Sequence, residues 1–184
     1  DIELLNSQVE RCNEILKRLT LNPVEEDEFI DKDINIRDYL HEIISSFKEI
    51  SKKEFVFNFD QDSNPKKISK SIEIVYGLRN FIGNANKFAK NSIFINLKSD
   101  SEFTELTVED DGNGYPRDII SKIGEPYLKS NYSKDKSKEG LGLGLFIGKT
   151  LLEKNFASVN CRNSKTRSGA EVIIRWKNKE LFNI

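Results

Sequence analysis

The sequence predicts an α/β fold, a two-layer sandwich in which a mixed, mostly antiparallel sheet packs on helices. Segments with the 3.6-residue apolar period of helices occur among segments that alternate apolar and polar residues, as strands do. Their order does not follow strict βαβ alternation, which disfavours an all-parallel sheet. With 184 residues, 37% of them hydrophobic, the chain is long enough for one such domain plus a short extension.

The first segment, residues 1–22, is predicted to be a helix with one apolar seam. Its apolar residues are spaced alternately three and four apart, like the a and d positions of a heptad repeat. Pro23 ends this helix, because a proline disfavours helical backbone in the residue before it. The segment is too short for a stable coiled coil alone, so we interpret it as the end of a longer bundle helix. The acidic residues 23–34 are then a linker. The seam comprises Ile2, Leu5, Val9, Cys12, Leu16 and Leu19.

Residues 35–184 are expected to form the folded domain. Asn35 is a suitable N-cap for its first helix, because an asparagine oxygen accepts a hydrogen bond from a free backbone N–H group. Residues 55–60 alternate as a strand, and a second helix is expected over residues 69–89. The apolar face of the first helix carries Leu40, Ile43, Ile44, Phe47 and Ile50.

A β-hairpin is expected next, with strands over residues 92–98 and 103–110 joined by a polar turn. A short helix over residues 117–123 follows the glycines after the hairpin. Residues 128–139 are polar, show no apolar period, and are expected to form a mobile loop or lid. The last elements are a helix over residues 141–154 and two strands, residues 158–163 and 169–176.

Composition excludes several classes of protein. The formal net charge is −1 with acidic and basic residues interspersed, so no nucleic-acid partner is expected. No apolar run reaches the roughly 18 residues needed to span a bilayer, so no direct membrane contact is expected. Because the chain lacks methionine and begins at Asp1, we interpret it as a fragment of a longer protein. Cys12 and Cys161 lack the spacing of a zinc site or a disulfide framework, which favours a reducing compartment.

The second helix carries a polar stripe of Asn80, Asn84 and Lys87. Residues spaced four and three apart lie on one face of a helix. Amide oxygens suit Mg²⁺, which prefers oxygen ligands, and a lysine ammonium suits a phosphate. The alternative is an ordinary solvated face. The residues expected to face the core are Leu78, Ile82, Ala85 and Phe88.

Asp110, Gly112 and Gly114 stand at the end of the second hairpin strand. A carboxylate there can accept a hydrogen bond from the amino group of a purine. The missing Cβ atoms of the glycines let a ring lie against the backbone. The alternative is a simple turn, since Asp-Gly is common in turns.

Two glycine signals lie close together near the last helix. Gly148-Lys149-Thr150 resembles the end of a P-loop, but the spacing of that motif requires a glycine where Leu143 stands. The other signal is Gly140, Gly142 and Gly144, which precede or begin the helix and can direct backbone N–H groups at an anion. A flexible linker is the alternative for these three glycines.

Taken together and in this order, the motifs resemble those of sensor histidine kinases, over about residues 35–176. The matching segments include the N box, Asn80 to Phe88, and the first glycine box, Asp110 to Gly114. They also include Glu125-Pro126-Tyr127 before the lid and the second glycine box, Gly140 to Leu145. The resemblance implies the GHKL-type ATP-binding fold. It is strongest to RegB/PrrB-type redox-responding kinases, through SQVERCNEIL, GEPYLKS, GLGLGLFIGKTLLE and GAEVIIRW.

The resemblance implies a role for each site residue, with ATP and Mg²⁺ as cofactors. Asp110 would contact the adenine amino group, with Gly112 and Gly114 beside it. Asn84 would coordinate Mg²⁺ with Asn80 nearby, and Lys87 would contact phosphate. Hydrolytic relatives commonly carry a glutamate where Asn80 stands, and an amide cannot take its place as a general base. The residues expected to line the phosphates are Gly140, Leu141, Gly142, Leu143 and Gly144.

The resemblance also implies an ATP-dependent protein-histidine kinase from the cytoplasmic part of an inner-membrane bacterial sensor. Residues 1–22 would then be the end of the second dimerisation helix of a homodimer, and a response regulator would receive the phosphoryl group. His41 is the only histidine, and it lacks the proline of an acceptor box, so the acceptor is expected outside this sequence.

Two questions stay open at this point. Cys12 at a d position is either a small apolar filler or a redox switch, because in a parallel dimer it would face its own copy. The protein itself is alternatively an ATP-sensing interaction module without phosphotransfer, or a serine kinase of the anti-sigma-factor type.

Overall fold

The computed structural model describes residues 34–60, 67–68, 71–126 and 143–181. The chain divides into two compact units, Asp1–Ile30 and Asp31–Ile184, and all the described residues belong to the second. The predicted helix over residues 1–22, Cys12, and the linker up to residue 33 therefore lie outside the described residues. So does the expected lid, residues 128–139.

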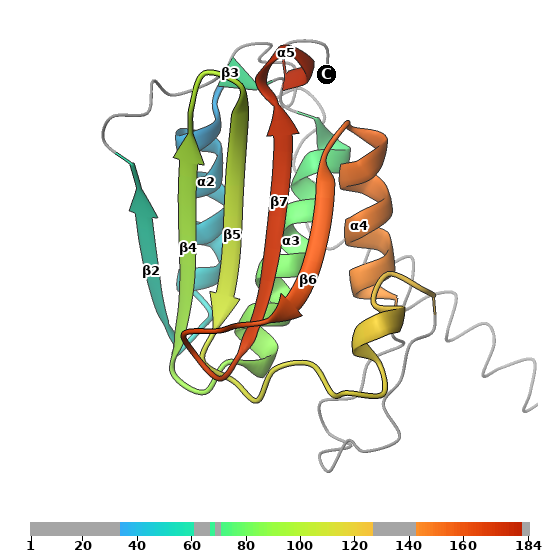
Figure 1. Cartoon of the computed structure of the whole chain (residues 1–184). Helices are drawn as coiled ribbons and strands as arrows, with labels where there is room; N and C mark the ends of the chain where they lie inside the picture. Colours follow the sequence, from blue (N-terminus) through green and yellow to red (C-terminus); the bar gives the residue numbers. More distant parts are fainter. Residues whose placement is uncertain (1–33, 61–66, 69–70, 127–142, 182–184) are drawn as a thin grey trace, which may run out of the picture. The chain divides into compact units, whose positions relative to one another are not determined.

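A five-stranded sheet in the order β2-β4-β5-β7-β6 forms one layer of the unit (Figure 1). β2 pairs with β4 in parallel, and the other three pairs are antiparallel, so the sheet is mixed and mostly antiparallel, as predicted. A second, two-stranded sheet pairs β1 with β3. The strands are β1 Ile34–Asn35, β2 Glu54–Phe59, β3 Lys67–Ile68, β4 Ser92–Ser99, β5 Phe103–Asp110, β6 Ser158–Asn163 and β7 Ala170–Lys177.

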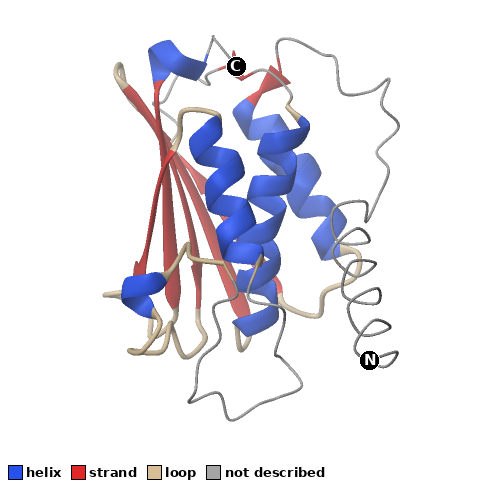
Figure 2. Ribbon diagram, turned by 90° about the vertical axis from the view of Figure 1, so that its right-hand side faces the viewer, coloured by secondary structure: helices blue, strands red, loops and turns tan. Residues whose placement is uncertain are grey.

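Helices form the second layer, and the long ones all lie on the same side of the sheet (Figures 1 and 2). The first helix begins where the sequence predicts, because the Asn35 side chain accepts a hydrogen bond from the Arg37 N–H group at 2.9 Å. No described helix is long and apolar enough to cross a membrane. The helical elements are α2 Ile36–Lys48, α3 Ile72–Phe88, η2 Ile120–Lys122, α4 Gly144–Lys154 and α5 Asn178–Leu181.

The core lies between the sheet and the helices. Alternate residues of β4 and β5 face the helices, as the period of two in their sequence predicts, and they are almost fully buried. Leu78, Ile82 and Ala85 of α3 meet them as expected. The buried residues of the two strands include Ile93, Ile95, Leu97, Leu106 and Val108.

Several local predictions were wrong. Ile50 is 79% exposed, because α2 ends two residues before it. Phe88 is 48% exposed, since it is the last residue of α3 and lies beyond the layer of side chains that meets the sheet. The helix expected over residues 117–123 is a single 3₁₀ turn, Ile120–Lys122. α3 and α4 begin three residues later than predicted.

α3 and α4 cross closely at two glycines. A methyl group at Gly77 would lie 2.7 Å from Cγ of Leu152. One at Gly148 would lie 2.9 Å from the Phe81 ring and 3.2 Å from the Gly77 carbonyl oxygen. Helices approach this closely only where side chains are absent. Gly148 is therefore a packing residue of the α3–α4 crossing.

Candidate functional site

Asp110 presents one fixed and one available carboxylate oxygen. It is the last residue of β5, faces the helix layer and is 3% exposed. Oδ1 accepts hydrogen bonds from the N–H groups of Gly112 at 2.8 Å and Ala170 at 3.3 Å. Oδ2 has no hydrogen-bond partner among the described residues. Among the described residues, every fully buried side-chain oxygen or nitrogen has a hydrogen-bond partner. Oδ2 has none, so it is not fully buried and a ligand can reach it.

Burial raises the pKa of the Asp110 carboxyl above its ordinary value. The hydrogen bonds from Gly112 and Ala170, and the positive charge of Lys53, oppose that rise in the pKa. These interactions thus offset only part of the free-energy cost of burying the ionised carboxylate. A donor arriving at Oδ2 would stabilise the carboxylate, which is what a buried recognition group requires.

The backbone around Asp110 is packed too tightly for a side chain at two positions. A methyl group at Gly112 would lie 2.4 Å from the carbonyl oxygen of Phe88. One at Gly169 would lie 1.8 Å from the carbonyl oxygen of Asp110 itself. Gly112 is predicted by its motif in the sequence, whereas Gly169, in the turn between β6 and β7, belongs to no recognised motif.

Gly114, the second predicted glycine of this box, has a positive φ of 73°. The segment that follows it is held by Asn163, the last residue of β6. The Asn163 oxygen accepts a hydrogen bond from the Tyr115 N–H at 2.6 Å, and its amide nitrogen donates to the Tyr115 carbonyl at 3.0 Å. This two-point contact fixes the chain as it leaves the Asp110 site.

The C-terminal end of α3 is tied to neighbouring elements. The Lys53 ammonium donates to the carbonyl of Ala89 at 2.6 Å and to that of Asn86. The Asp111 carboxylate accepts hydrogen bonds from the Asn91 N–H at 3.0 Å. Cations favour helix C-termini, where carbonyl groups lack partners. α3 is thereby anchored next to Asp110.

Asn80 and Asn84 meet the first residue of α4. A methyl group at Gly144 would lie 3.4 Å from Oδ1 of Asn80 and 3.6 Å from the amide nitrogen of Asn84. The Asn80 amide nitrogen donates to the Tyr76 carbonyl at 2.8 Å, which leaves its oxygen directed toward Gly144. The Asn84 side chain makes no hydrogen bond with the rest of the described structure. The fold thus brings the N box and the end of the second glycine box together.

The two amide oxygens suit a hard cation such as Mg²⁺, which takes few protein ligands when phosphates supply the rest. Leu143, the N-cap residue of α4, provides no side-chain cap. The N–H groups in the first turn of α4 therefore have no partner within the helix and are directed beyond its N-terminus, where Asn80 and Asn84 meet Gly144. Over the described ranges, no group of three or more His, Cys, Asp or Glu residues is arranged to hold a metal. Gly140, Leu141 and Gly142 lie outside the described residues.

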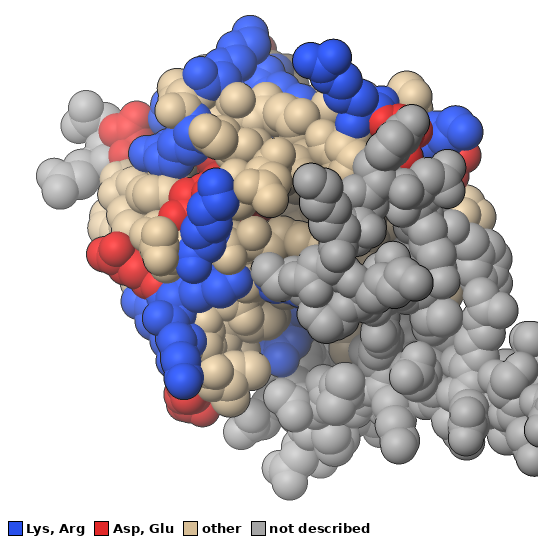
Figure 3. Space-filling model, turned by 90° about the horizontal axis from the view of Figure 1, so that it is seen from below, with Lys and Arg blue, Asp and Glu red and all other residues tan. Residues whose placement is uncertain are grey.

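The lysines near the site differ in position. Lys87 lies one turn after Asn84 on α3, half-buried, with its ammonium 5.3 Å from the centre of the Phe88 ring. Lys149, from the rejected P-loop signal, instead packs its carbon chain over Gly124. Figure 3 views the end of the domain where β5 ends, and it shows Lys and Arg side chains there among Asp and Glu side chains and uncharged surface.

The chain matches the family model described as histidine kinase-, DNA gyrase B-, and HSP90-like ATPase over residues 69–180. The sensor histidine kinase RegB of Cereibacter sphaeroides is 30% identical over 172 residues, 89% of this chain and 37% of the relative. A putative NtrY-like sensor histidine kinase of Rickettsia bellii is 30% identical over 106 residues, 55% of this chain and 16% of that protein. The chain thus spans well under half the length of these curated relatives.

Solved structures agree with the fold. The catalytic domain of the histidine kinase ThkA is 20% identical with a TM-score of 0.65, covering 79% of this chain and 96% of that one. The mycobacterial sensor histidine kinase MprB is 18% identical with a TM-score of 0.64, covering 79% and 95%. At these identities the likeness shows the fold, and it confirms the predicted GHKL-type α/β sandwich.

Proposed function

Because the chain belongs to the histidine kinase-, DNA gyrase B-, and HSP90-like ATPase family, we propose that residues 35–184 are the catalytic, ATP-binding domain of a sensor histidine kinase. Mg-ATP is bound here and its γ-phosphoryl group passes to a histidine on a dimerisation helix, for relay to a response regulator. One observation carries the proposal. The fold gathers a buried carboxylate with an available oxygen and, on α3, two amide oxygens against the start of α4.

Asp110 is proposed to recognise adenine. Its Oδ2 is an acceptor, and the 6-amino group of adenine is a donor. Gly112 adds no side chain, so a flat ring can lie close to the backbone. The burial of the carboxylate strengthens a hydrogen bond made there, because less water competes for it.

Asn84 is proposed to hold Mg²⁺ with Asn80 nearby, while Lys87 and the N–H groups at the start of α4 contact phosphate. Bound Mg²⁺ would neutralise phosphate charge and hold the phosphate oxygens in one arrangement. Gly144 leaves room for this, since a side chain there would approach both amides. Gly140, Leu141, Gly142 and Leu143 are proposed to line the phosphates as well.

Asn80 favours transfer to a protein side chain over hydrolysis. Its amide cannot abstract a proton from water at neutral pH. Its nitrogen is also committed to the Tyr76 carbonyl, so the group is held as an oxygen donor. Phosphoryl transfer requires positioning and charge neutralisation more than covalent chemistry, and a sparse polar site supplies both.

His41 is not proposed as the phosphoacceptor. It lies on α2 with its ring edge-on to Phe57, 4.6 Å between ring centres, a packing arrangement typical of a structural aromatic contact. The acceptor is proposed to be another histidine, on the dimerisation helices of a longer protein. Incubation with ATP should therefore yield no stable phosphohistidine at His41, which mass spectrometry of the labelled chain would test.

As the resemblance of the sequence motifs to sensor histidine kinases implies, the chain is further proposed to act as the cytoplasmic part of a homodimeric inner-membrane sensor. Cys12 is the candidate redox group. The pKa of the Cys161 thiol, in contrast, is raised by burial to about 11, which disfavours the reactive thiolate. Nonreducing electrophoresis after mild oxidation tests Cys12, and a purely monomeric band would exclude the bridge between protomers.

Calorimetric titration with ATP, with and without Mg²⁺, tests the site. Asp110→Asn exchanges the acceptor at Oδ2 for a donor and should weaken ATP binding at least about tenfold. Asn84→Ala should remove the part of the affinity that depends on Mg²⁺. Asn96→Ala, on the opposite face of the sheet, is the control and should bind as the wild type does. An unchanged affinity for ATP in Asp110→Asn would contradict the assignment of Asp110 as the adenine contact.

A further inference from the structure

Glu109 precedes the proposed adenine contact and points to the opposite face of the sheet. It is 4% exposed, although the helices lie on the other side. Oε2 pairs with the Arg167 guanidinium at 2.7 Å, and Oε1 accepts from the Thr166 hydroxyl at 3.1 Å and from the Ser164 hydroxyl. All three donors belong to the turn between β6 and β7. In Figure 1 this turn crosses in front of the lower ends of β4 and β5.

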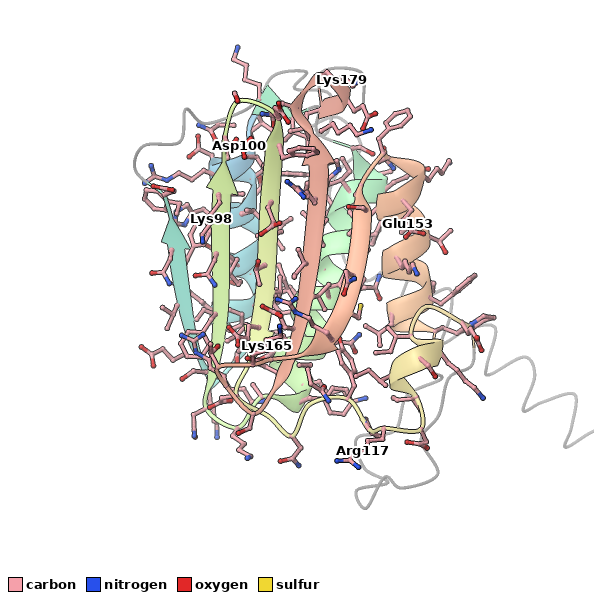
Figure 4. All side chains as sticks on the ribbon, viewed as in Figure 1. Lys98, Asp100, Arg117, Glu153, Lys165 and Lys179 are labelled. Atoms are coloured by element: carbon pink, nitrogen blue, oxygen red, sulfur yellow. The ribbon has the colours of Figure 1, made fainter. Side chains whose placement is uncertain are left out.

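The turn has an internal structure that keeps these donors together. The Ser164 hydroxyl oxygen accepts from the N–H groups of Thr166 at 3.1 Å and Arg167 at 2.8 Å. The Arg167 guanidinium lies 3.8 Å above the Phe94 ring, so it is held from below as well. Lys165, at the tip, lies over the outer face of the sheet in Figure 4. Glu109 is the group on β5 to which this turn is attached.

The same turn delivers the contacts that orient Asp110. Gly169 ends it, packed against the Asp110 carbonyl, and the N–H of the next residue, Ala170, donates to Oδ1 of Asp110. Glu109 is paired with Glu171 in the β5–β7 register, so the turn closes directly beside the site. The turn therefore positions one of the two donors that commit Oδ1 of Asp110, the Ala170 N–H at 3.3 Å; the other is the Gly112 N–H at 2.8 Å.

We propose that Glu109 is a positioning residue that sets the purine selectivity of the nucleotide site. By holding the β6–β7 turn on β5, it keeps the Ala170 N–H on Oδ1 beside the Gly112 N–H, so that Oδ2 stays an unshared, oriented acceptor. Such an acceptor selects purines with a 6-amino group over purines with a 6-oxo group, which present an acceptor at the same place. The inference rests on the proposed function, in particular on Asp110 as the adenine contact.

A merely structural ion pair would behave differently. Loss of Glu109 would then lower stability and weaken every nucleotide by the same factor. Positioning instead predicts a change in the ratio of two affinities, because a loosened carboxylate can turn and offer either oxygen to water or ligand. The outer face supplies a matched control. Glu171 pairs with Arg162 there, opposite Glu109, and does not contact the side chains of the turn.

The test is titration of the full chain with Mg-ATP and with Mg-ITP, its 6-oxo analogue. In Glu109→Gln the ATP-to-ITP affinity ratio should fall at least about tenfold, mostly through weaker ATP binding, whereas Glu171→Gln should keep the wild-type ratio. An unchanged ratio in a folded Glu109→Gln variant overturns the inference. Should that variant fail to fold, Arg167→Met, which removes the guanidinium that pairs with Glu109, decides the matter by the same ratio.

Asp110→Asn separates this inference from the proposed function. If Asp110→Asn leaves ATP binding intact, the adenine assignment itself fails. If Asp110→Asn weakens ATP while Glu109→Gln leaves the ratio unchanged, the nucleotide site stands and the positioning role of Glu109 falls.

Discussion

At the scale of single residues, the ionised carboxylate of Asp110 lowers the stability of the ligand-free fold, although the proposed contact with adenine requires it. Its burial raises the pKa of the carboxyl, so folding favours the protonated form. The stability that protonated Asp110 contributes is fully present below the pKa of an aspartate in the unfolded chain, about 3.9. That stability is lost as the pH rises through the higher pKa of the folded state. At neutral pH the ligand-free protein therefore carries a partly uncompensated charge.

Asp110→Asn should accordingly make the ligand-free protein more stable at neutral pH, by about 1 kcal/mol, while it weakens ATP binding. Asparagine keeps an oxygen for the Gly112 and Ala170 N–H groups and cannot ionise. Urea unfolding at several pH values measures this. The difference between variant and wild type should grow as the pH rises above about 4, because the pKa of Asp110 is raised in the folded state. A difference that does not change with pH would contradict the raised pKa.

Gly169→Ala should destabilise the fold strongly. Its methyl group would lie 1.8 Å from the Asp110 carbonyl oxygen, a backbone atom that cannot move aside. We expect a loss of at least about 2 kcal/mol in the free energy of unfolding, together with weaker ATP binding. Gly83→Ala is the control. Its methyl group would meet the Phe47 ring at 3.7 Å, an ordinary contact, so it should stabilise α3 by roughly 0.5–1 kcal/mol. Thermal unfolding of both variants would show opposite shifts.

The candidate site residues that could be recognised from the sequence are those that belong to short motifs. Asn80, Asn84 and Asp110 stand in recognisable spacings. Glu109 gave no such signal, because its partners lie 55 to 58 positions away along the chain. Ala170 was missed for the same reason, since its contact with Asp110 depends on the β5–β7 pairing.

At the scale of elements, the α3–α4 crossing assembles the amide part of the site. Gly148→Ala should push α4 from α3, because the added methyl group would meet both Phe81 and the Gly77 carbonyl oxygen. We expect a loss of about 1–3 kcal/mol in stability and weaker Mg-dependent ATP binding. Thr150→Ala, exposed two residues on, should change stability by less than about 0.5 kcal/mol. Normal nucleotide affinity in Gly148→Ala would show that the crossing does not position the site.

Element types were predicted better than element ends. Apolar periods identified every strand of the large sheet and all three long helices, because these periods reflect which face is buried. Ile50 and Phe88 were misplaced because they stand at helix ends, where tertiary contacts decide whether another turn forms. The short segment at residues 117–123 carries apolar residues at helical spacing, yet it is too short to be stable as a helix.

At the scale of the whole molecule, ligand binding should stabilise the fold by mass action. ATP at a hundredfold its dissociation constant should add about 2.7 kcal/mol to the free energy of unfolding, because only the folded chain brings α3, α4 and β5 together. Fluorescence of Trp176, the single tryptophan and fully buried, reports the transition. Asp110→Asn, with an affinity at least about tenfold weaker, should gain no more than about 1.4 kcal/mol at the same ATP concentration. If ATP raised the free energy of unfolding equally in the wild type and in Asp110→Asn, the nucleotide would bind elsewhere.

The fold class was predictable, but its strand order was not. Strand and helix periods define two layers, and the hairpin of β4 and β5 follows from a short polar turn. The parallel pairing of β2 with β4 and the entry of β7 between β5 and β6 are long-range choices that no local pattern specifies. Those choices bring the turn after β6 to Asp110.

The order of the elements also divides the site between two halves of the chain. A cut between residues 126 and 143 would leave Asn80, Asn84 and Asp110 on one piece, and Gly144 and Ala170 on the other. The pieces would meet along the β5–β7 pairing and the α3–α4 crossing. Neither piece alone has a complete site, so nucleotide binding would appear only when they reassociate. We therefore expect recovered ATP binding to signal the encounter of two separately expressed fragments.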